Sequence, residues 1–218
     1  MSPHVSKPRR PGRPTGTANS TQTQTQILNA AIVCFSEGGY SFTSNREIAQ
    51  RAQVTTGLLY HYFASKQDLY RCALREANAC LIQAYRAACD AAPDASSMEQ
   101  LCLGLERVIA LSESRPGLMR FAGNAVAEVQ QHPELVVVDE ATDDSFLALF
   151  TSLLERARAR DELLPEVDIV SAASVLLACF IGLGLMHGVL HSESTYAQVL
   201  RSFQHLIMGH FAQSPTSA

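Results

Sequence analysis

The sequence predicts an all-α protein, and three observations support this fold class. Hydrophobic residues make up 47% of the 218 residues, whereas aromatic residues make up only 7% and tryptophan is missing. A core rich in alanine and leucine favours helices packed on helices over a sandwich or a barrel. Apolar residues recur at spacings of three and four along most of the chain, and no segment alternates with the period of a strand.

The N-terminal segment is expected to be a flexible basic arm over residues 1–21. It holds four basic residues and four prolines, followed by serine, threonine and glutamine. The helical pattern begins at Thr25, with Ile27 and Ala31 on one face. It stops at Gly38-Gly39, because glycine is a common terminator of helices.

Two short helices and a long one are expected next, each opened by a residue suited to cap a helix. Ser44 and Glu47 have the spacing of a capping box. Thr55 and Ser65 are good N-caps for the two helices that follow. The three expected helices cover residues 45–52, 55–63 and 65–92.

Five further helices are expected in the remainder, which gives nine in all. The breaks fall at punctuation residues, namely Ser114-Arg115-Pro116, His132-Pro133 and Leu164-Pro165. Pro116 and Pro165 suit the first turn of a helix. The five helices are expected over residues 96–113, 116–130, 134–160, 166–191 and 195–212.

Charge is distributed unevenly, although the net charge is only −4. Up to Lys66, seven lysines and arginines stand against two glutamates, a balance of +5. From Gln67 onward, ten arginines stand against nineteen acidic residues, a balance of −9. A basic N-terminal third on an acidic remainder predicts that one end of the protein meets a polyanion.

The six cysteines have neither the spacing of a zinc site nor a CxxC pair. No secretory signal precedes them, so reduced thiols in a cytoplasmic protein are expected. A redox-sensing thiol is the alternative, but no single cysteine stands out.

Three helices in the first 63 residues, two of them short and joined by a tight turn, are what a helix-turn-helix requires. Ile48, Ala49, Val54, Leu59 and Phe63 are spaced to face a shared core. The opposite face of the third helix then offers Thr56, Gly57, Leu58, Tyr60, His61 and Tyr62.

Three segments carry a specific pattern, residues 42–52, 54–63 and 65–69. Their most diagnostic portion reads Gly-x-Leu-Tyr-x-Tyr-Phe-x-Ser-Lys over residues 57–66. Together they resemble the DNA-binding domain of TetR/AcrR-family transcriptional regulators, over about residues 22–75. The rest of the chain resembles that family only in its size and helical pattern.

The resemblance implies a homodimer whose third helix enters the major groove of DNA. Thr56, Gly57 and Leu58 would approach base edges. Tyr60 and Tyr62 would donate to phosphates, and Lys66 would hold another phosphate at a helix N-terminus. The expected DNA-binding residues are Arg9, Arg10, Arg13, Ser44, Asn45, Arg46, Thr55, Thr56, Gly57, Leu58, Tyr60, His61, Tyr62 and Lys66.

Two departures from the family pattern bear on this expectation. Gln53 stands where the family usually has a turn glycine, so we expect it in a left-handed conformation, which costs about 1 kcal/mol or more. Asn45 and Leu58 are less usual choices at their positions, and this affects the target sequence, not the binding itself.

The arm is expected to add a second contact. The stretch Arg9 to Pro14 resembles the Arg-Gly-Arg-Pro core of AT-hook segments. Its arginines would lie in a narrow A·T minor groove beside the main site. The alternative is a basic tail attracted to any phosphate.

Residues 169–190 contain no charge, so this stretch is long enough to span a bilayer. Acidic residues flank it instead of lysine or arginine, which favours a helix buried between the domain core and a dimer partner. A membrane-tethered protein is the alternative. In a dimer, this buried helix and the helix over 195–212 from each subunit would form a four-helix interface, as the resemblance also implies. The expected interface residues are Ser174, Ala178, Gly182, Gly184, Gly188, Val199, Phe203, Leu206 and His210.

No catalytic motif or phosphate-binding loop is found, so we expect neither enzyme activity nor a cofactor. His187 and His191 have a spacing compatible with a metal, but no third ligand accompanies them on that face. Interface or capping roles are favoured for both histidines, and a metal sensor is the alternative.

The resemblance also implies a small-molecule effector between helices of the C-terminal part. A mainly apolar ligand with one or two hydrogen bonds is expected there. The candidate lining residues are Tyr85, Cys89, Met119, Phe121, Asn124, Phe146, Phe150 and Phe180.

The expected architecture is a basic arm over 1–21, a helix-turn-helix domain over 22–66 and a helical effector-binding and dimerisation domain over 67–218. The expected function is a dimeric repressor released from a pseudo-palindromic operator by its ligand. A ligand-independent regulator or activator is the first alternative.

Overall fold

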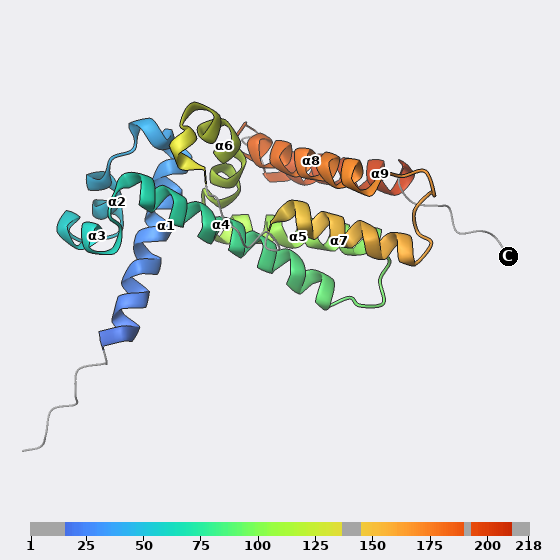
Figure 1. The fold of residues 1–218 in the computed structure, drawn as a ribbon, viewed down its shortest axis with the longest axis horizontal. Helices are drawn as coiled ribbons and strands as arrows, with labels where there is room; N and C mark the ends of the chain where they lie inside the picture. The colour runs from blue at the N-terminus through green and yellow to red at the C-terminus, as the bar shows by residue number, and fades with distance from the viewer. Residues whose placement is uncertain (1–15, 137–144, 190–192, 211–218) are drawn as a thin grey trace, which may run out of the picture.

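The computed structural model describes residues 16–136, 145–189 and 193–210, and this part of the chain is almost entirely helical (Figure 1). The predicted all-α fold class is confirmed, and nine α-helices and one short 3-10 helix fall within these residues. In order they are α1 (Gly16–Phe42), α2 (Asn45–Arg51), α3 (Thr56–Tyr62), α4 (Lys66–Asp90), α5 (Ser97–Ser114), α6 (Leu118–Gln131), η1 (Pro133–Leu135), α7 (Phe146–Ala159), α8 (Ile169–Val189) and α9 (Glu193–His210).

Helix α1 begins earlier than the sequence predicts. Residues 16–21 were expected in the flexible arm, but they are helical. The segment has no apolar stripe, so periodicity gave no sign of it. It is held instead by a contact from outside, because the hydroxyl of Tyr62 donates to Ser20 Oγ at 3.3 Å. Arg9, Arg10 and Arg13 lie outside the described residues.

The end of α1 follows the prediction closely. Gly39 has φ 69° and ψ 177°, so the regular helix stops there and a short turn continues to Phe42. A Cβ at Gly39 would lie 2.6 Å from Glu128 Oε1, so a side chain there would displace the Glu128 carboxylate. The glycine therefore meets two requirements at once, the left-handed backbone and the close approach of α6.

Two predicted helix starts are wrong in detail. Helix α6 begins at Leu118 after Gly117, whose φ is 82°, so Pro116 lies in the preceding turn. The helix expected over 134–160 is instead the single turn η1 followed by α7, which Ser145 caps by accepting the N–H of Ala148. Residues 137–144 lie outside the described chain.

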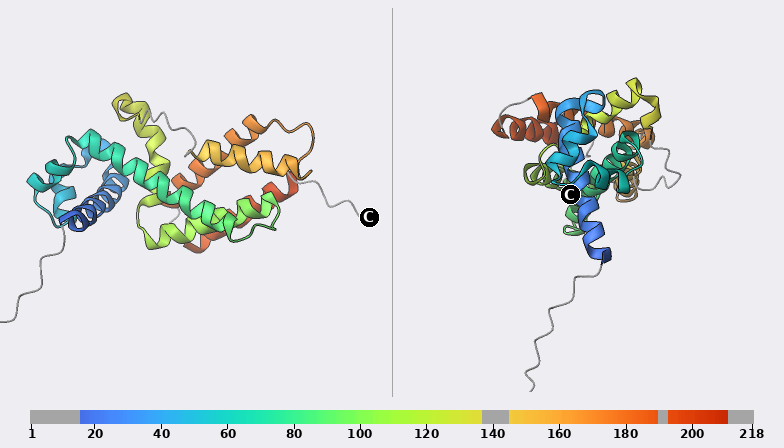
Figure 2. Two further views of the ribbon diagram at one scale, coloured as in Figure 1. Left: turned by 60° about the horizontal axis from the view of Figure 1, so that its bottom comes forward. Right: turned by 90° about the vertical axis from the view of Figure 1, so that its left-hand side faces the viewer.

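The helices form an elongated molecule with two ends joined by α4. Figure 1 and Figure 2 show α1, α2 and α3 at one end and α5, α7, α8 and α9 at the other. Helix α6 packs on α1 and on α8, so it too connects the two groups. The rings of Phe35, Tyr70 and Phe121 pack 4.9–6.0 Å apart where α1, α4 and α6 meet.

Helix α8 uses its small residues inside the chain. A Cβ at Gly123 of α6 would lie 3.0 Å from the backbone of Gly184, so the two glycines allow α6 and α8 to approach closely. Gly184 was expected in the dimer interface, but in the single chain it faces α6, with Met119 and Gly123 next to it. The other face of α8 is open in the single chain, with Val170 and Val175 exposed.

The membrane alternative concerns the same helix. The stretch Ile169–Met186 is the one helical segment within the described residues that is long and apolar enough to cross a membrane, and 33% of it is buried. The buried side of α8 packs against α6 and α7, as in a core helix of a helical domain.

The packing of α4 on α5 yields a stability prediction. A Cβ at Gly104 would overlap the ring of Tyr85, which is fully buried. We expect Gly104→Ala to lower the free energy of unfolding by about 1–2 kcal/mol in a urea titration, because overpacking outweighs the gain in helix propensity. Gly57→Ala is the control, since its Cβ meets only Thr55 Oγ1 at 4.0 Å. Equal stability of the two variants would contradict this packing.

Candidate nucleic-acid interface

The turn between α2 and α3 has the geometry of a helix-turn-helix. Ser44 accepts the N–H of Glu47 at 3.2 Å, and Thr55 accepts the N–H of Leu58 at 3.1 Å, so each short helix has its predicted cap. Gln53 has φ 55°, which confirms the expected left-handed conformation. The N–H of Val54 then donates to the carbonyl of Ala49 at 2.9 Å and closes the turn.

The buried face of the two short helices is as predicted. Ile48, Ala49, Leu59 and Phe63 are at most 2% exposed and belong to one core with α1 and α4. Val54 is half-buried against the same core. Helices of seven residues are not stable alone, so this burial fixes their orientation.

The opposite face of α3 is uncovered. Leu58 is 37% exposed and Tyr60 is 52% exposed, and Gly57 and His61 lie beside them on the surface. Thr56 is half-buried at the start of the helix. A methyl group at Gly57 would meet nothing closer than 4.0 Å, so the structure itself does not require glycine there.

At the start of α2, two of the three expected DNA-binding residues are accessible. Ser44 and Arg46 are exposed, but Asn45 is buried, so its side chain would have to turn outward to make the expected contact with DNA. Asn45 stands three and four residues before Ile48 and Ala49, which puts it on the core face of the helix. Its Oδ1 has no hydrogen-bond partner among the described residues.

Tyr62 and Lys66 are occupied within the chain. The half-buried Tyr62 donates to Ser20 and so ties α3 to the first turns of α1. Lys66 Nζ donates to the carbonyl of Ser41 at 3.2 Å and lies 4.5 Å above the ring of Tyr40. Burial lowers the pKa of Lys66, and the nearby Glu128 partly opposes this effect. Both side chains were expected to hold phosphates and would have to leave these partners to do so.

A polar junction connects these helices to the rest of the molecule. Glu128 Oε1 of α6 accepts the backbone N–H of Tyr40 at 3.0 Å. His132 Nε2 and Ser41 Oγ share a hydrogen bond at 2.8 Å, and Gln67 donates to the carbonyl of Glu134 at 2.6 Å. The partners lie 67 to 91 residues apart, so no local pattern in the sequence indicates this junction.

The eight candidate pocket residues do not converge on one cavity. Tyr85 and Cys89 line a cleft of about 690 Å³ between α4, α5 and α7. Phe146, Phe150 and Phe180 pack on one another, with ring centroids 4.3–6.1 Å apart, and serve as core. The remaining three, Met119, Phe121 and Asn124, lie on α6.

The sequence predictions did not include three arginines of this cleft, Arg86 on α4 and a pair at the end of α7, Arg156 and Arg160. The pair's spacing of four residues puts it on one face of α7, and this is the signal that was available.

The expected dimer residues on α8 and α9 have mixed surroundings. Ser174 and Ala178 are exposed, and nothing lies within 4 Å of a Cβ at Gly182. Leu206 of α9 is 55% exposed. Val199 and Phe203 pack against Leu183 of α8, as the predicted pairing of these two helices requires. The side chains of His187 and His210, together with Gly188 and His191, lie outside the description.

Within the described residues, no group of three His, Cys, Asp or Glu side chains is close enough to hold a metal ion.

The comparison with known families bears directly on the helix-turn-helix. Residues 27–72, from α1 into α4, match the family described as bacterial regulatory proteins, tetR family. Over these residues the chain resembles the DNA-binding part of TetR-family proteins. This match supports a DNA-binding transcriptional regulator of the TetR family.

Relatives of this chain align with it well beyond the DNA-binding helices. The transcriptional regulator UidR of Escherichia coli K12 is 23% identical over 83% of this chain and 90% of its own length. The transcriptional repressor BepR of Brucella suis is 27% identical over 84% of this chain and 88% of its own. A TetR regulator from Chloroflexus aurantiacus has the same fold, with a TM-score of 0.72 and 20% identity over 90% of this chain and 100% of its own.

The open space at Gly57 gives a prediction for DNA binding. We expect Gly57→Ala to leave the stability intact but to weaken binding of a preferred duplex about tenfold or more, because the added methyl group keeps the backbone of α3 from the base edges. Fluorescence anisotropy at constant salt measures this effect. Gly209→Ala is the control, since Gly209 is also exposed and has nothing within 4 Å of a Cβ. Wild-type affinity in Gly57→Ala would exclude close approach at this position.

Proposed function

We propose that this regulator is a homodimeric repressor that acts in the cytoplasm, binds a pseudo-palindromic operator and is released by a small-molecule effector. The observation that carries the proposal is the two-sided character of α3. Its buried side is fixed in a core by Leu59, and its open side presents Gly57, Leu58 and Tyr60. A helix held rigidly on one side and free on the other can enter a major groove without rearrangement.

The proposed base and phosphate contacts divide along the same helix. Gly57 and Leu58 would lie nearest the base edges, where Leu58 can contact a thymine methyl group. Thr55, Thr56, Tyr60 and His61 would flank them and position the helix on the sugar-phosphate backbone. Ser44 and Arg46 at the start of α2, with the arginines of the arm, extend the proposed contact.

Dimerisation is supported by the uncovered apolar surface of the last two helices. Val170, Val175 and Leu206 are more than half exposed in the single chain. Exposed apolar side chains grouped on neighbouring helices are typical of a surface that a partner covers. A second copy related by two-fold symmetry would build a four-helix interface from α8 and α9.

Release by an effector is supported by the course of α4 and α6. Helix α4 runs from Lys66 beside the DNA-binding helices to Asp90 at the α4–α5–α7 cleft. Ligand binding that favours one position of α4 would change the spacing of the two DNA-binding units of the dimer. Glu128 and His132 of the polar junction would transmit any shift of α6 in the same way.

Selection of bound sequences from random duplex DNA tests the DNA-binding part of the proposal. A dimer predicts a two-fold symmetric motif, with half-sites spaced by about one helical turn or a multiple of it. The selection uses purified full-length protein at near-physiological salt, because phosphate contacts weaken as salt rises. An asymmetric motif, or no enrichment from folded protein, would contradict the dimeric repressor.

The dimer surface is tested by placing a charge on it. We expect Val175→Glu to yield monomers in sedimentation velocity experiments, because an unpaired carboxylate would be buried at the interface. Val126→Glu is the matched control, since Val126 of α6 is similarly exposed at 46% against 51%. A dimer that survives Val175→Glu but not Val126→Glu would move the interface to another face.

A further inference from the structure

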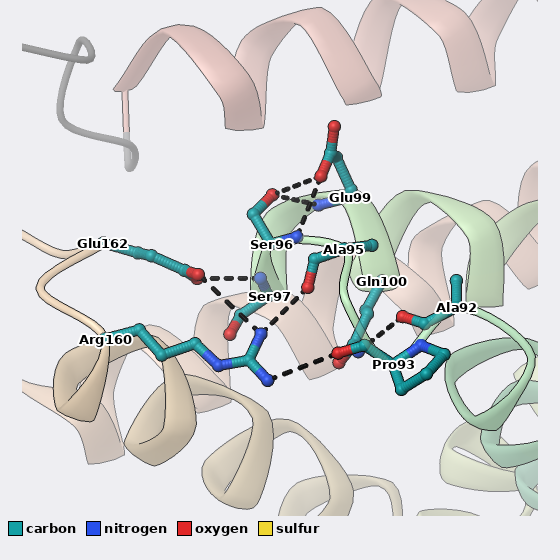
Figure 3. Close-up of polar contacts among 9 residues, drawn as sticks. All are labelled: Ala92, Pro93, Ala95, Ser96, Ser97, Glu99, Gln100, Arg160 and Glu162. Carbon is teal, nitrogen blue, oxygen red and sulfur yellow. Dashed lines mark hydrogen bonds and ion pairs between the residues drawn. The ribbon is translucent and has the colours of Figure 1, made fainter.

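The cleft between α4, α5 and α7 has features that bear on the chemical nature of its ligand. Its volume of about 690 Å³ is that of a site for a small organic molecule. One wall is the connection between α4 and α5, which includes Pro93. Figure 3 shows that Arg160, at the end of α7, donates to the carbonyls of Ala95 at 2.9 Å and Pro93 at 3.5 Å. These hydrogen bonds hold the α4–α5 connection against the end of α7, so this wall of the cleft is fixed in place.

The charge of the lining is opposite to that of the surrounding chain. From Gln67 onward the sequence has ten arginines and a balance of −9. Three of these arginines, Arg86, Arg156 and Arg160, line this one cleft, together with a single acidic residue, Asp90. The cleft is thus a local concentration of positive charge in an acidic part of the protein, which favours an anionic occupant.

Arg156 has donors directed at neutral acceptors. Its Nη1 donates to the carbonyl of Ser152 at 3.4 Å and to the hydroxyl of the same residue at 3.0 Å. Arg160 differs, because its Nη1 lies 3.9 Å from the carboxylate of Glu162 and also donates to the carbonyl of Ala95 (Figure 3). A guanidinium whose acceptors among the described residues are neutral gains a stronger hydrogen bond when a carboxylate or phosphate arrives.

Tyr85 is a second polar residue of the lining. It lines the cleft, it is 1% exposed, and its hydroxyl has no partner among the described residues. The close approach of Gly104 to the ring and the edge-on contact with Phe150 at 5.9 Å fix its orientation. A buried hydroxyl without a partner costs about 1–3 kcal/mol, so an acceptor brought by a ligand would recover that cost.

The titratable groups facing this hydroxyl are Cys89 and Cys102, and the charged one is Arg156. Burial raises the pKa of Tyr85, so its O–H stays a donor at neutral pH. Ala148, Leu149 and Pro93 supply apolar surface beside these donors. The lining therefore combines a neutral O–H donor and guanidinium donors with a surface for an apolar body.

We propose that this cleft binds an organic anion, a carboxylate or a phosphate monoester joined to an apolar body, with Arg156 and Tyr85 donating to the anionic group. The inference rests on the proposed function, since the anion would be the effector of this regulator. It replaces the mainly apolar ligand expected from the sequence with a charged one.

Titration calorimetry on the full-length, DNA-free protein tests this proposal with four probes that share one chain. Octanoate and octyl phosphate carry the two anionic groups, octan-1-ol is neutral and octylammonium is cationic. We expect both anions to bind at least about tenfold more tightly than the alcohol or the ammonium, the factor for one charged hydrogen bond of about 1.4 kcal/mol. The stronger anion identifies the head group. Equal binding of all four probes, or binding of none at millimolar concentration, would overturn the proposal.

Two variants assign the preference to the cleft. Arg156→Gln should abolish the preference for anions, whereas Arg107→Gln should keep it, because Arg107 is exposed on α5 and does not line the cleft. Tyr85→Phe should weaken anion binding several-fold and yet leave the melting temperature of the free protein unchanged or higher, because it removes an unsatisfied hydroxyl. If Tyr85→Phe retains full affinity, or Arg107→Gln loses as much as Arg156→Gln, the assignment fails.

These measurements need no DNA, so they separate the two proposals. Anion binding without any anion-linked change in operator affinity would contradict the effector part of the proposed function and keep the site. Operator binding without anion binding would contradict the site and keep the DNA-binding regulator.

Discussion

Helix α4 is the constraint on which the rest of the structure depends, because one continuous helix belongs to both ends of the molecule. Leu69 and Tyr70 in its first turns close the core of the DNA-binding helices, and Tyr85 in its last turns forms part of the cleft wall. Its 25 residues extend about 37 Å at about 1.5 Å per residue. A ligand effect proposed for the cleft would therefore have a direct route to the DNA-binding helices, because the same helix packs against both.

The polar junction determines how far α4 can move alone. Glu134 accepts hydrogen bonds at its carbonyl from Gln67 and Arg71 of α4, while Glu128 of α6 holds the backbone of Tyr40 in α1. The first turns of α4, the end of α1 and the end of α6 are therefore linked to each other. A shift of α4 must either carry α6 with it or break several hydrogen bonds, each of which contributes about 0.5–1.5 kcal/mol. These hydrogen bonds therefore oppose an independent movement of α4.

The sequence was most informative where local rules decide the structure. Ser44, Thr55 and Gln53 were predicted correctly because caps and turn conformations depend on neighbouring residues. Prediction failed where distant segments decide. Ser20 is helical although its segment has no apolar stripe, and Tyr62, 42 residues away, contacts it. At Asn45 a local rule and the family resemblance gave different predictions. Its spacing to Ile48 puts it on the core face of α2, where it is buried, whereas the resemblance predicts a contact with DNA.

The small residues of α8 show how one sequence pattern can serve two partners. Gly182 and Gly184 were expected on one dimer face, but two residues along a helix differ by about 200° in direction. Gly184 therefore faces Gly123 of α6, whereas Gly182, with Ser174 and Ala178 at spacings of four, lies on the open side. The close contact of α6 with α8 fixes which side remains open. It follows that any partner covering α8 must approach from the side opposite α6, the helix that carries Glu128 and His132 of the polar junction.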